Sequence, residues 1–400
     1  MLSQFAALLQ QLILQLVLLC ARTMCSSRPS CASVVQSPSL RRTVGGSPVA
    51  SLRLPSVFLA AAAVAFRLAQ SQGGAVAFSG MATAPRGRSL RVVSYNICGL
   101  GAGFGPPDNE KVTTTYGLLR ADMQRLKPHV LCLQEARRLP LTDPEGQARA
   151  DSLDALASDL GMTLTFAHAT PGFEKFGNAI LVSSDLQLLG SQSVHLNGGS
   201  VVKTPAGKDK RIVRGCVGVH LAFQSEHSSE DQDCVQFAVL ATHWDHIAES
   251  ERLAQATHVL GSAKDLIGGL PHLLVGDLNA MKRSDYTPDE WAALEERNRQ
   301  RSWAPLEDSS ALAALEAAGY LDVMQMTVEG LGSAMDVDQG PPAARFTAPR
   351  ERPMRLDYAY TSSNWNALSA GGTYTAPVAW IDVDAQGSDH LPLVVDAELG

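Results

Sequence analysis

The N-terminal part of this 400-residue chain lacks acidic residues altogether. No Asp or Glu precedes Asp108, whereas eight arginines lie before Ser89. Of the 33 basic residues, 25 therefore lie from Ser89 onward, against all 40 acidic residues, and this part has a net charge of −15. The sequence thus divides into a basic leader and a strongly acidic body.

The leader, residues 1–88, has the acid-free, Arg- and Ser-rich composition that is typical of transit peptides for mitochondria or plastids. We expect it to be largely disordered and to direct the protein to such an organelle, with residues 89–400 forming the folded body. The apolar run Leu12–Cys20 leaves secretion open, although no Lys or Arg precedes it. Translation from Met81 would instead give a cytosolic or nuclear protein.

The chain also has no cysteine framework, no long apolar run and few aromatic residues. Its seven cysteines show no CxxC or other metal-ligand spacing, which argues against a zinc module and a disulfide scaffold. The apolar run Val57–Phe66 of the leader is short for a bilayer span. We also expect no stable membrane insertion of the mature body. Aromatic residues make up only 6%, which disfavours a stacking platform for single-stranded nucleic acid.

From Leu90 onward, short apolar runs alternate with turns and a few helical stretches. The runs are nearly continuous in their inner portions, as in sheets that are covered on both faces. Strands are predicted at Leu90–Asn96, Val130–Gln134, Ala179–Ser183, Val213–Ala222, Val235–Thr242, His272–Val275, Arg355–Thr361 and Leu391–Ala397. Helices are predicted at Thr114–Leu126, Asp151–Leu160, Glu249–Ile267, Pro288–Arg301 and Ser309–Ala318. The pattern indicates one α+β domain with two packed sheets and outer helices.

Polar side chains of catalytic type occur at the ends of these strands. Asn96 ends the first strand in VVSYNICGLG, and Glu135 follows the second in VLCLQEARR. His243 follows another apolar strand in FAVLATHWDH. A strand end is a rigid mount that opens on a cleft, so it can hold reacting groups in place. An ionised carboxylate there suits Mg²⁺, which takes few protein ligands and keeps several waters.

Three further motifs follow the same rule. Asp277 and Asn279 in PHLLVGDLNA are spaced so that both point the same way in an extended chain. Asp357 lies in RLDYAYTS, in a strand that is otherwise apolar or aromatic. Asp389 and His390 introduce the last strand in GSDHLPLVV.

All six motifs, in this order, resemble those of the endonuclease/exonuclease/phosphatase superfamily. This superfamily includes DNase I-like nucleases, tyrosyl-DNA phosphodiesterases, sphingomyelinases and inositol polyphosphate phosphatases. GDLNA with a terminal SDHLPL is a specific pair, and the resemblance runs from Leu90 to the C-terminus. It implies that residues 89–400 form a DNase I-like catalytic domain, a four-layered α/β-sandwich of two mixed sheets flanked by helices. The THWDH stretch is similar to uncharacterised and tyrosyl-DNA phosphodiesterase-like branches.

The resemblance also implies a role for each matched residue. Glu135 resembles the principal Mg²⁺ ligand, with Asn96 beside it and Asp389 as an auxiliary residue; Mn²⁺ could replace Mg²⁺. Asp277 and Asn279 resemble the pair that orients the attacking water and holds the phosphate. His243 resembles the phosphate-contacting or acid histidine, and Asp357 resembles the carboxylate that orients His390. Asn96 is also expected to contact the substrate.

The chemistry of phosphodiester hydrolysis suits these residue types. Asp277 could accept the proton of the attacking water, and His390, kept protonated by Asp357, would donate to a phosphate oxygen. Asn96 and Asn279 would supply neutral hydrogen bonds that add no repulsion toward an anionic substrate.

Two features leave alternatives open. Asn178, in KFGNAILVS, matches a recurrent stretch of the superfamily and either contacts the substrate or satisfies a neighbouring turn. Asp245 and His246 either extend the site or cap the helix that starts near Glu249.

Charge narrows the range of substrates. Tracking a long duplex usually needs a basic stripe, which a body with a charge of −15 does not offer. We therefore favour short or terminal phosphodiesters of nucleic-acid type, with phospholipid or inositol phosphate esters as the alternative. The local basic clusters either bind phosphates near the cleft or are solvated loop charges: Lys203–Lys210–Arg211–Arg214, Lys282–Arg283 and Arg345–Arg350–Arg352–Arg355.

A catalytically inactive scaffold of the same fold is the alternative of a different class. The intact Glu135, Asp277, Asn279, Asp357 and His390 weigh against it, because a scaffold has no need of clustered charge. We expect an enzyme that acts as a monomer on a phosphate ester.

Overall fold

The computed structural model describes residues 88–102, 107–142, 148–168, 175–203, 207–223, 234–300, 305–331, 346–348, 354–368 and 375–399. The expected leader lies outside the described residues except for Arg88, which is the first residue of strand β1 and pairs with Leu399. None of the described helices is both long and apolar enough to cross a bilayer.

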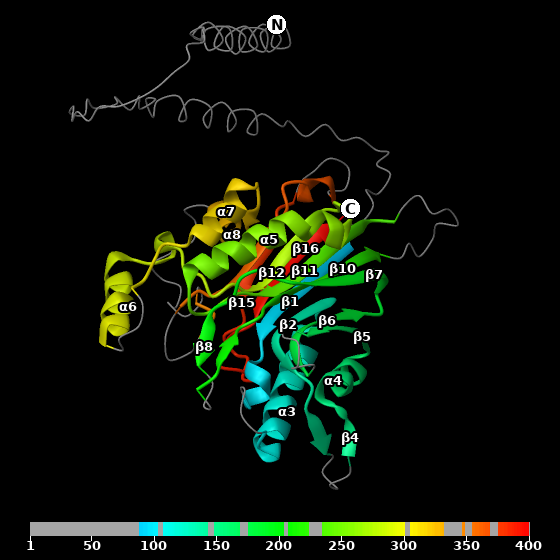
Figure 1. The fold of residues 1–400 in the computed structure, drawn as a ribbon. Coiled ribbons are helices and arrows are strands. Elements are labelled where there is room, and N and C mark those ends of the chain that lie inside the picture. Colours follow the sequence, from blue (N-terminus) through cyan, green and yellow to red (C-terminus); the bar gives the residue numbers. More distant parts are fainter. Residues whose placement is uncertain are drawn as a thin grey trace, which may run out of the picture. The chain divides into compact units, whose positions relative to one another are not determined.

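Two six-stranded sheets form the centre of the fold (Figure 1). In the first sheet the strand order is β15-β16-β1-β2-β6-β5, and in the second it is β13-β14-β12-β11-β10-β7. The first sheet consists of β1 (Arg88–Asn96), β2 (Val130–Arg137), β5 (Met162–His168), β6 (Phe176–Ser183), β15 (Val378–Ile381) and β16 (Leu393–Leu399). The second consists of β7 (Leu186–His195), β10 (Gly215–Phe223), β11 (Gln236–His243), β12 (His272–Asp277), β13 (Leu321–Asp322) and β14 (Asp357–Thr361).

Helices cover the outer face of each sheet, which confirms the predicted four-layered sandwich (Figure 1). The first sheet is covered by α3 (Asn109–Leu126) and α4 (Ser152–Leu160), and the second by α5 (Glu249–Ile267) and α7 (Ser310–Ala317). The remaining elements are α6 (Pro288–Gln300), α8 (Val323–Leu331), the 3₁₀ helices η1 (Cys98–Gly101), η3 (Arg283–Asp285) and η6 (Trp365–Leu368), and two hairpins, β3–β4 (Pro140–Thr142, Ala148–Asp151) and β8–β9 (Val201–Lys203, Asp209–Arg211).

The continuous apolar runs of the sequence reflect burial on both faces of a strand. In β1, Leu90 and Val92 belong to the core between the two sheets. Val93 and Tyr95 point the other way, into the core under α3 and α4. Alternate residues of one strand therefore fill two different cores, and most positions before the strand end are apolar.

Each sheet contains one parallel pair of strands among its described pairings, and these two pairs position the site. β1 runs parallel to β2, with Asn96 opposite Gln134, and β11 runs parallel to β12, with His243 opposite Asp277. The carboxyl ends of parallel strands lie at the same edge of a sheet. Asn96 and Glu135 therefore lie near one another on the first sheet, as His243 and Asp277 do on the second.

Candidate active site

The carboxyl ends of the two parallel strand pairs meet across the sandwich. The amide nitrogen of Asn96, at the end of β1, donates to Asp277 Oδ2 of β12 at 2.8 Å. The same nitrogen lies 3.5 Å from Glu135 Oε1. The Oδ1 of Asn96 accepts from the backbone N–H of Cys98 at 2.9 Å, which fixes the orientation of the amide. Asn96 thus links a carboxylate of each sheet, while its direct contact with a metal ion or substrate stays a prediction.

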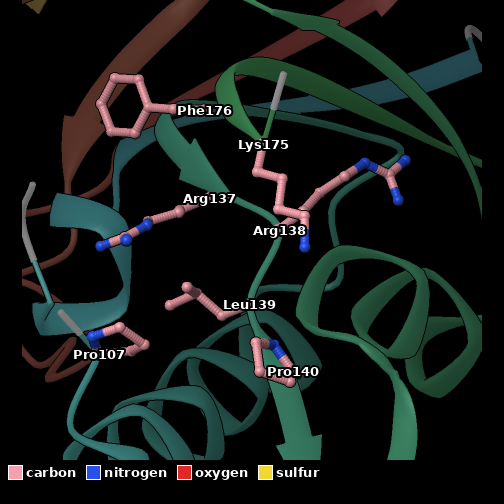
Figure 2. Close-up of a pocket in the computed structure, with 7 residues that line it drawn as sticks. All are labelled: Pro107, Arg137, Arg138, Leu139, Pro140, Lys175 and Phe176. Carbon is pink, nitrogen blue, oxygen red and sulfur yellow. The ribbon is translucent and has the colours of Figure 1, made fainter. Parts of the chain in front are cut away.

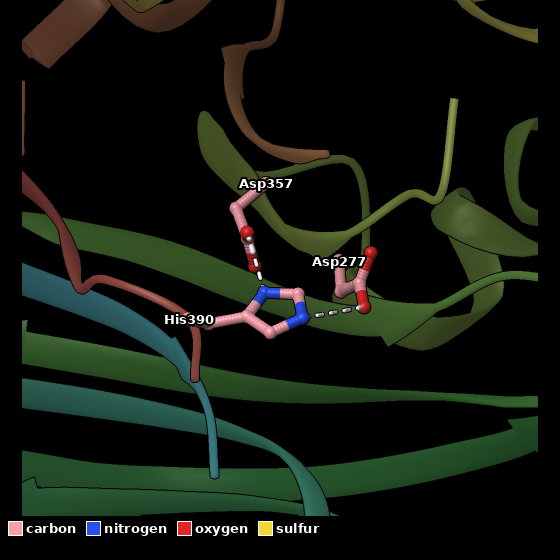
Figure 3. Close-up of side chains that lie close together, drawn as sticks. All are labelled: Asp277, Asp357 and His390. Carbon is pink, nitrogen blue, oxygen red and sulfur yellow. Dashed lines mark hydrogen bonds and ion pairs between the residues drawn. The ribbon is translucent and has the colours of Figure 1, made fainter. Parts of the chain in front are cut away.

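Asp357 and His390 form a buried dyad beside Asp277 (Figure 3). His390 Nδ1 lies 2.9 Å from Asp357 Oδ2, and His390 Nε2 lies 3.9 Å from Asp277 Oδ2. Burial alone would lower the pKa of His390, but Asp357, Asp277 and Asp389 outweigh it and raise this pKa to about 10. His390 is therefore a cation at neutral pH, with Nδ1–H held by Asp357 and Nε2–H directed at Asp277.

Asp277 is a carboxyl group whose surroundings disfavour its charge. Burial and repulsion from Asp357 raise its pKa to about 7, against the opposing effects of His390 and Asn96. Its Oδ1 accepts from the backbone N–H of Asn279 at 3.0 Å. A carboxyl group with a pKa near neutrality is suited to proton transfer.

The GDLNA motif needs glycine at its first position, Gly276, because there is no room for a side chain there. Gly276 has φ 148°, and a Cβ there would lie 1.9 Å from the carbonyl oxygen of Thr242 in β11. Only glycine allows the strand that carries Asp277 to approach its parallel neighbour this closely.

Glu135 lies at an irregularity in β2. The pairing of β2 with β6 shifts between Leu133 and Ala136, and Glu135 has φ 49°, a left-handed conformation that is uncommon for a non-glycine residue. This local bulge turns the carboxylate toward the other sheet, where Glu135 Oε1 lies 4.0 Å from His243 Nε2.

The site contains a set of oxygen donors that fits a hard divalent cation. Glu135 and Asp389 both lie close enough to the Cys98 thiol that, together with burial, they raise its pKa to about 12. Negative charge is therefore crowded around Asn96, which bridges the carboxylates of Glu135 and Asp277. Such crowding of carboxylates is favourable when a cation neutralises it. Asp277, Asp357 and His390 also lie within ligand distance of each other, but the hydrogen bond from His390 to Asp357 already occupies that group.

His243 is held in its neutral form by a buried arginine. Arg214 Nη1 lies 3.0 Å from His243 Nδ1. On the other side of the ring, His243 Nε2 lies 3.5 Å from Asp277 Oδ2 and 3.0 Å from the amide nitrogen of Asn279. Burial and the charge of Arg214 lower the pKa of His243 well below its ordinary value. Because a guanidinium only donates, His243 Nδ1 accepts, and the proton of the neutral ring lies on Nε2, which faces Asp277. The amide nitrogen of Asn279 is a donor too, so it makes no hydrogen bond with this Nε2–H and donates to the carbonyl oxygen of Trp244 at 3.2 Å.

Asp245 stabilises the loop between β11 and α5 and does not join the group of reacting side chains. Its Oδ2 accepts from the backbone N–H of Ser200, and its Oδ1 accepts from the Ser200 hydroxyl, each at 2.8 Å. Oδ1 also accepts from the backbone N–H groups of Ile247 and Ala248 at 2.8 and 3.0 Å. Burial would raise the pKa of Asp245, but these hydrogen bonds lower it. His246 was predicted, like Asp245, either to extend the site or to cap the following helix. Its Nδ1 lies 3.0 Å from Arg214 Nη2, so His246 lies next to the site.

We expect Asp245→Ala to lower the free energy of unfolding by about 3 kcal/mol, because it leaves several buried N–H groups without an acceptor. Urea unfolding of the full-length variant measures this loss. Asp265→Ala, at an exposed position of α5, is the matched control and should leave the midpoint nearly unchanged. A loss below about 1 kcal/mol for Asp245→Ala would contradict the role assigned to its hydrogen bonds.

Asn178 joins the two sheets beneath the site. Its amide nitrogen donates to the carbonyl oxygen of Gly215 at 2.8 Å, and this oxygen also accepts from the Thr242 hydroxyl at 3.1 Å. Asn178 is buried on β6, whereas Gly215 and Thr242 belong to the second sheet. The structure thus gives Asn178 a structural contact, and its expected contact with the substrate stays a prediction.

The basic clusters of the sequence have different environments. Arg214 and Arg355 are both buried, and Arg355 forms ion pairs with Asp322 at 2.6 Å and Asp285 at 3.2 Å. Lys203 pairs with Asp209, and Lys282 pairs with Glu316. Arg345, Arg350 and Arg352 lie outside the described residues.

Arg214 is the functional residue that sequence reasoning placed least well. Its cluster was predicted either to bind phosphates near the cleft or to be solvated loop charge, yet Arg214 is buried directly before β10, which is antiparallel to β11 with Cys216 opposite Thr242. The start of β10 therefore lies beside the end of β11, where His243 is found. The available signal was a single charged residue within a predicted apolar strand, the same signal that pointed to Asp357.

Comparison with known proteins agrees with this geometry. A family model described as the endonuclease/exonuclease/phosphatase family matches residues 93–390. Similar solved structures include the human Nocturnin catalytic domain with bound sulfate (18% identity, 80% of this chain and 96% of that chain covered, TM-score 0.48). They also include truncated Caenorhabditis elegans TDP2 (16%, 78% and 98%, 0.44) and the Bacteroides thetaiotaomicron mannosyl-6-phosphatase (16%, 76% and 98%, 0.45). No curated protein matches the chain.

Proposed function

Since this chain belongs to the endonuclease/exonuclease/phosphatase family, we propose that it is a Mg²⁺-dependent hydrolase of phosphodiesters, with short or terminal substrates of nucleic-acid type. The observation that carries the proposal is the pair formed by Asp277 and His390. A carboxyl group with a pKa of about 7 lies 3.9 Å from an imidazolium with a pKa of about 10, beside the first-sheet residues Glu135 and Asn96 that would hold a cation. One group accepts a proton at neutral pH and the other can donate one.

Asp277 acts as the general base. Its Oδ2 faces His390 and His243 and accepts from Asn96, while its Oδ1 is held by the backbone N–H of Asn279. A water hydrogen-bonded to Asp277 would lose its proton to this carboxylate as its oxygen bonds to phosphorus. The bond from phosphorus to the leaving ester oxygen would break in the same step, and this oxygen would take a proton from solvent. Asn96 and Asn279 keep the carboxylate from turning away from that water.

His390 donates from Nε2 to a phosphate oxygen. Its partner Asp357 is buried and is held in turn by Thr347, whose hydroxyl accepts from the Asp357 backbone N–H at 3.0 Å. The imidazolium is thus fixed in direction and in charge before the substrate arrives, so its donor does not have to reorganise during the reaction.

His243 is a neutral hydrogen-bond donor in this proposal. Its Nε2–H faces the same space as Asp277 and Glu135, and Arg214 keeps the opposite nitrogen as an acceptor. Of the two roles that the resemblance implies, the phosphate contact therefore fits better than that of a proton source. A divalent ion held by Glu135 and Asp389 beside Asn96 would neutralise charge on the phosphate oxygens.

We expect hydrolysis of bis-p-nitrophenyl phosphate by the full-length protein to depend on added metal. Turnover should fall by more than about 100-fold in EDTA and return with Mg²⁺ or Mn²⁺. Single-stranded and duplex oligonucleotides, a 5′-phosphotyrosyl oligonucleotide, sphingomyelin and an inositol phosphate would run in parallel to rank the substrates. Full turnover in EDTA would contradict metal dependence. A folded protein that binds Mg²⁺ but hydrolyses none of these substrates would favour the inactive scaffold.

A further inference from the structure

We propose that His246 binds the phosphate group that is hydrolysed, through a hydrogen bond from its Nε2–H, and that the buried Arg214 is the positioning residue for His246 and His243 together. This inference rests on the proposed function and adds a substrate-binding residue to the same site. The structural feature that carries it is a buried guanidinium that donates to two imidazole rings.

Arg214 is a buried cation without a carboxylate partner among the described residues. Its Nη1 donates to His243 Nδ1 and its Nη2 donates to His246 Nδ1, each at 3.0 Å. Its Nε is buried as well and contacts no acceptor in this part of the chain. The carboxylates of the site attract its charge only from a greater distance. A buried charge without a paired counter-charge destabilises a fold, and an anion that binds nearby offsets this cost.

Arg214 determines which nitrogen of each ring carries the proton. A guanidinium can only donate, so both Nδ1 atoms accept, and the proton of each neutral ring lies on Nε2. Loss of solvent around the rings and the charge of Arg214 lower the pKa of His243 and of His246, so both rings are neutral at pH 7. The two imidazoles therefore present the same donor, Nε2–H, from the two arms of one guanidinium.

The His246 ring has no second hydrogen bond in the part of the chain that the structure describes. The residue lies at the surface, and its Nδ1 alone has a partner. It does not cap α5, because no side chain caps this helix and Asp245 accepts from the N–H groups of Ile247 and Ala248. The Nε2–H of His246 is thus an oriented donor that is open to a ligand.

The loop between β11 and α5 fixes His246 beside His243. Asp245, between the two histidines, accepts from the backbone N–H and the hydroxyl of Ser200, and its carbonyl oxygen accepts from Arg252 Nη1 at 3.1 Å. The bond to Arg214 fixes the ring of His246 in turn. His246 is therefore held at the exposed edge of the site, three residues after His243.

Neutral N–H donors next to a buried cation suit a phosphate oxygen. A hydrogen bond to a charged oxygen is stronger than one between neutral groups, and Arg214 polarises the Nε2–H of both rings. His243 Nε2 lies 3.5 Å from Asp277, the base of the proposed reaction. Because both rings are bonded to one guanidinium, His246 contacts the same phosphate from the side that faces solvent. The charge of Arg214 thus acts on the substrate through the two rings while the guanidinium stays buried.

A nearby pocket does not offer the same chemistry. It has a volume of about 240 Å³, lies at the end of β2, and is lined by Arg138, Leu139, Pro140 and Phe176 among other residues (Figure 2). Its accessible lining is mostly apolar, and the charge of Arg138 is paired with Asp151 and Asp154. This pocket suits an apolar part of a ligand, so the phosphate contact is assigned to His246.

Steady-state hydrolysis of bis-p-nitrophenyl phosphate by the full-length protein in saturating Mg²⁺ tests the contact. His246→Ala should raise KM by about 20-fold, as expected for a lost hydrogen bond to a charged group, and change kcat by less than about threefold. His246→Gln should keep KM within about threefold of the wild type, because its amide can accept from Arg214 and donate to the phosphate. Ser250→Ala, at an exposed position in the first turn of α5, is the control and should leave both constants unchanged.

A double-mutant cycle tests the positioning role of Arg214. Arg214→Met replaces the buried charge with an apolar side chain of similar length, and near-UV circular dichroism checks that the variant is folded. KM should rise at least as much as in His246→Ala, and adding His246→Ala should then change KM by less than about twofold. Independent, additive effects would overturn the positioning role. If Arg214→Met does not fold, the variants of the surface residue His246 still decide the phosphate contact.

NMR of full-length protein with ¹⁵N-labelled histidine rings detects binding without turnover. The His246 signals are identified by their loss in His246→Ala, and they should show the proton on Nε2. Dimethyl phosphate, a phosphodiester with one charged group, should shift the Nε2 signal of His246 in the presence of Mg²⁺. A proton on Nδ1, or an Nε2 signal that does not move at any concentration of dimethyl phosphate, would overturn the inference.

The outcomes separate this inference from the proposed function. Metal-dependent turnover with an unchanged KM in His246→Ala, or with equal losses in the Ala and Gln variants, would remove the phosphate contact of His246 and leave the hydrolase intact. A protein without turnover on any substrate, in which dimethyl phosphate still shifts the His246 signal, would lose the proposed function and keep the phosphate site.

Discussion

Asp277→Asn should reduce kcat for bis-p-nitrophenyl phosphate by about 10⁴-fold, at the upper end of what loss of a general base costs. The substitution keeps the shape of the side chain and can accept a hydrogen bond from either Asn96 or Asn279, though not from both, and the amide cannot accept the proton of water. Steady-state kinetics under saturating Mg²⁺ measure the loss. Asp265→Asn, on the exposed face of α5, is the matched control. A loss of less than about 10-fold would assign the base to another group.

The pH dependence of the wild-type rate tests the same role. The base acts in its deprotonated form, so the rate rises with pH through the pKa of Asp277. Without a metal, this pKa is raised to about 7 by burial and by the neighbouring Asp357. A bound cation favours the charged carboxylate, so the acidic limb of the rate profile should lie below pH 7 in Mg²⁺.

Asp277→Asn should also stabilise the metal-free protein. The pKa of Asp277 is higher in the folded state than in the unfolded chain. The contribution of its protonation to the free energy of unfolding is therefore complete below about pH 4 and is lost as pH rises through about 7. At pH 8 without divalent metal, removing this ionisable group should raise the free energy of unfolding by about 3 kcal/mol. Urea unfolding in EDTA measures the gain, and a variant less stable than the wild type would contradict the crowding of charge at this site.

His390→Ala should reduce kcat by about 10³-fold, because it removes the imidazolium that faces Asp277. Asp357→Asn is the sharper variant, since it keeps the ring and removes the charge that raises the pKa of His390 to about 10. The donor acts in its protonated form, so the wild-type rate falls as pH rises through that value. In Asp357→Asn the alkaline limb should move toward the ordinary histidine pKa of about 6.5.

A pH–rate profile of kcat separates this role from a structural one. A residue that only supports the fold would lower kcat at every pH without moving the alkaline limb. Thr257→Val, an exposed position of α5 whose hydroxyl bonds only the backbone of its own helix, is the control for general effects of substitution. An alkaline limb that stays in place in Asp357→Asn would contradict the proposed dyad.

The layer architecture and most site residues could be predicted from the sequence because strands buried on both faces are mostly apolar, so that polar residues directly after them are conspicuous. Asn96, Glu135, His243 and Asp277 each follow an apolar run, and the structure brings these four together. The helix Glu249–Ile267 was also predicted with its observed bounds, since its period and flanking Gly268 are local signals.

Strands that lack this apolar signal were missed. β7 has mostly half-buried or exposed residues, and its sequence is largely polar, as in an edge strand with one solvated face. The predicted start of α3 at Thr114 was five residues late, because Asp108 caps the helix at Asn109 by accepting from the N–H groups of Glu110 and Lys111. Such a capping residue lies in the chain before the apolar repeat from which the start of the helix was predicted.

The partners of several buried polar side chains had no sequence signal. Arg214, Asn178 and Asp245 each act through a partner that is distant in the chain, namely His243, Gly215 and Ser200. A pattern read along one strand gives the face on which a residue lies but not the residue that it meets across the sandwich. The sequence predicted that Asp357 keeps His390 protonated, whereas the raised pKa of Asp277 depends on its burial next to Asp357 and could not be predicted.

The pairing of β1 with β16 has a consequence for biosynthesis. Arg88 pairs with Leu399, so one edge of β1 has no hydrogen-bonding partner until nearly all of the described chain has left the ribosome. The same late segment carries His390, and hence a nascent chain cannot assemble the proton donor before the first sheet is complete. A product of early termination would leave the edge of β1 unpaired and would lack His390. The cell's protein quality control could therefore remove it before a catalytic fragment accumulates.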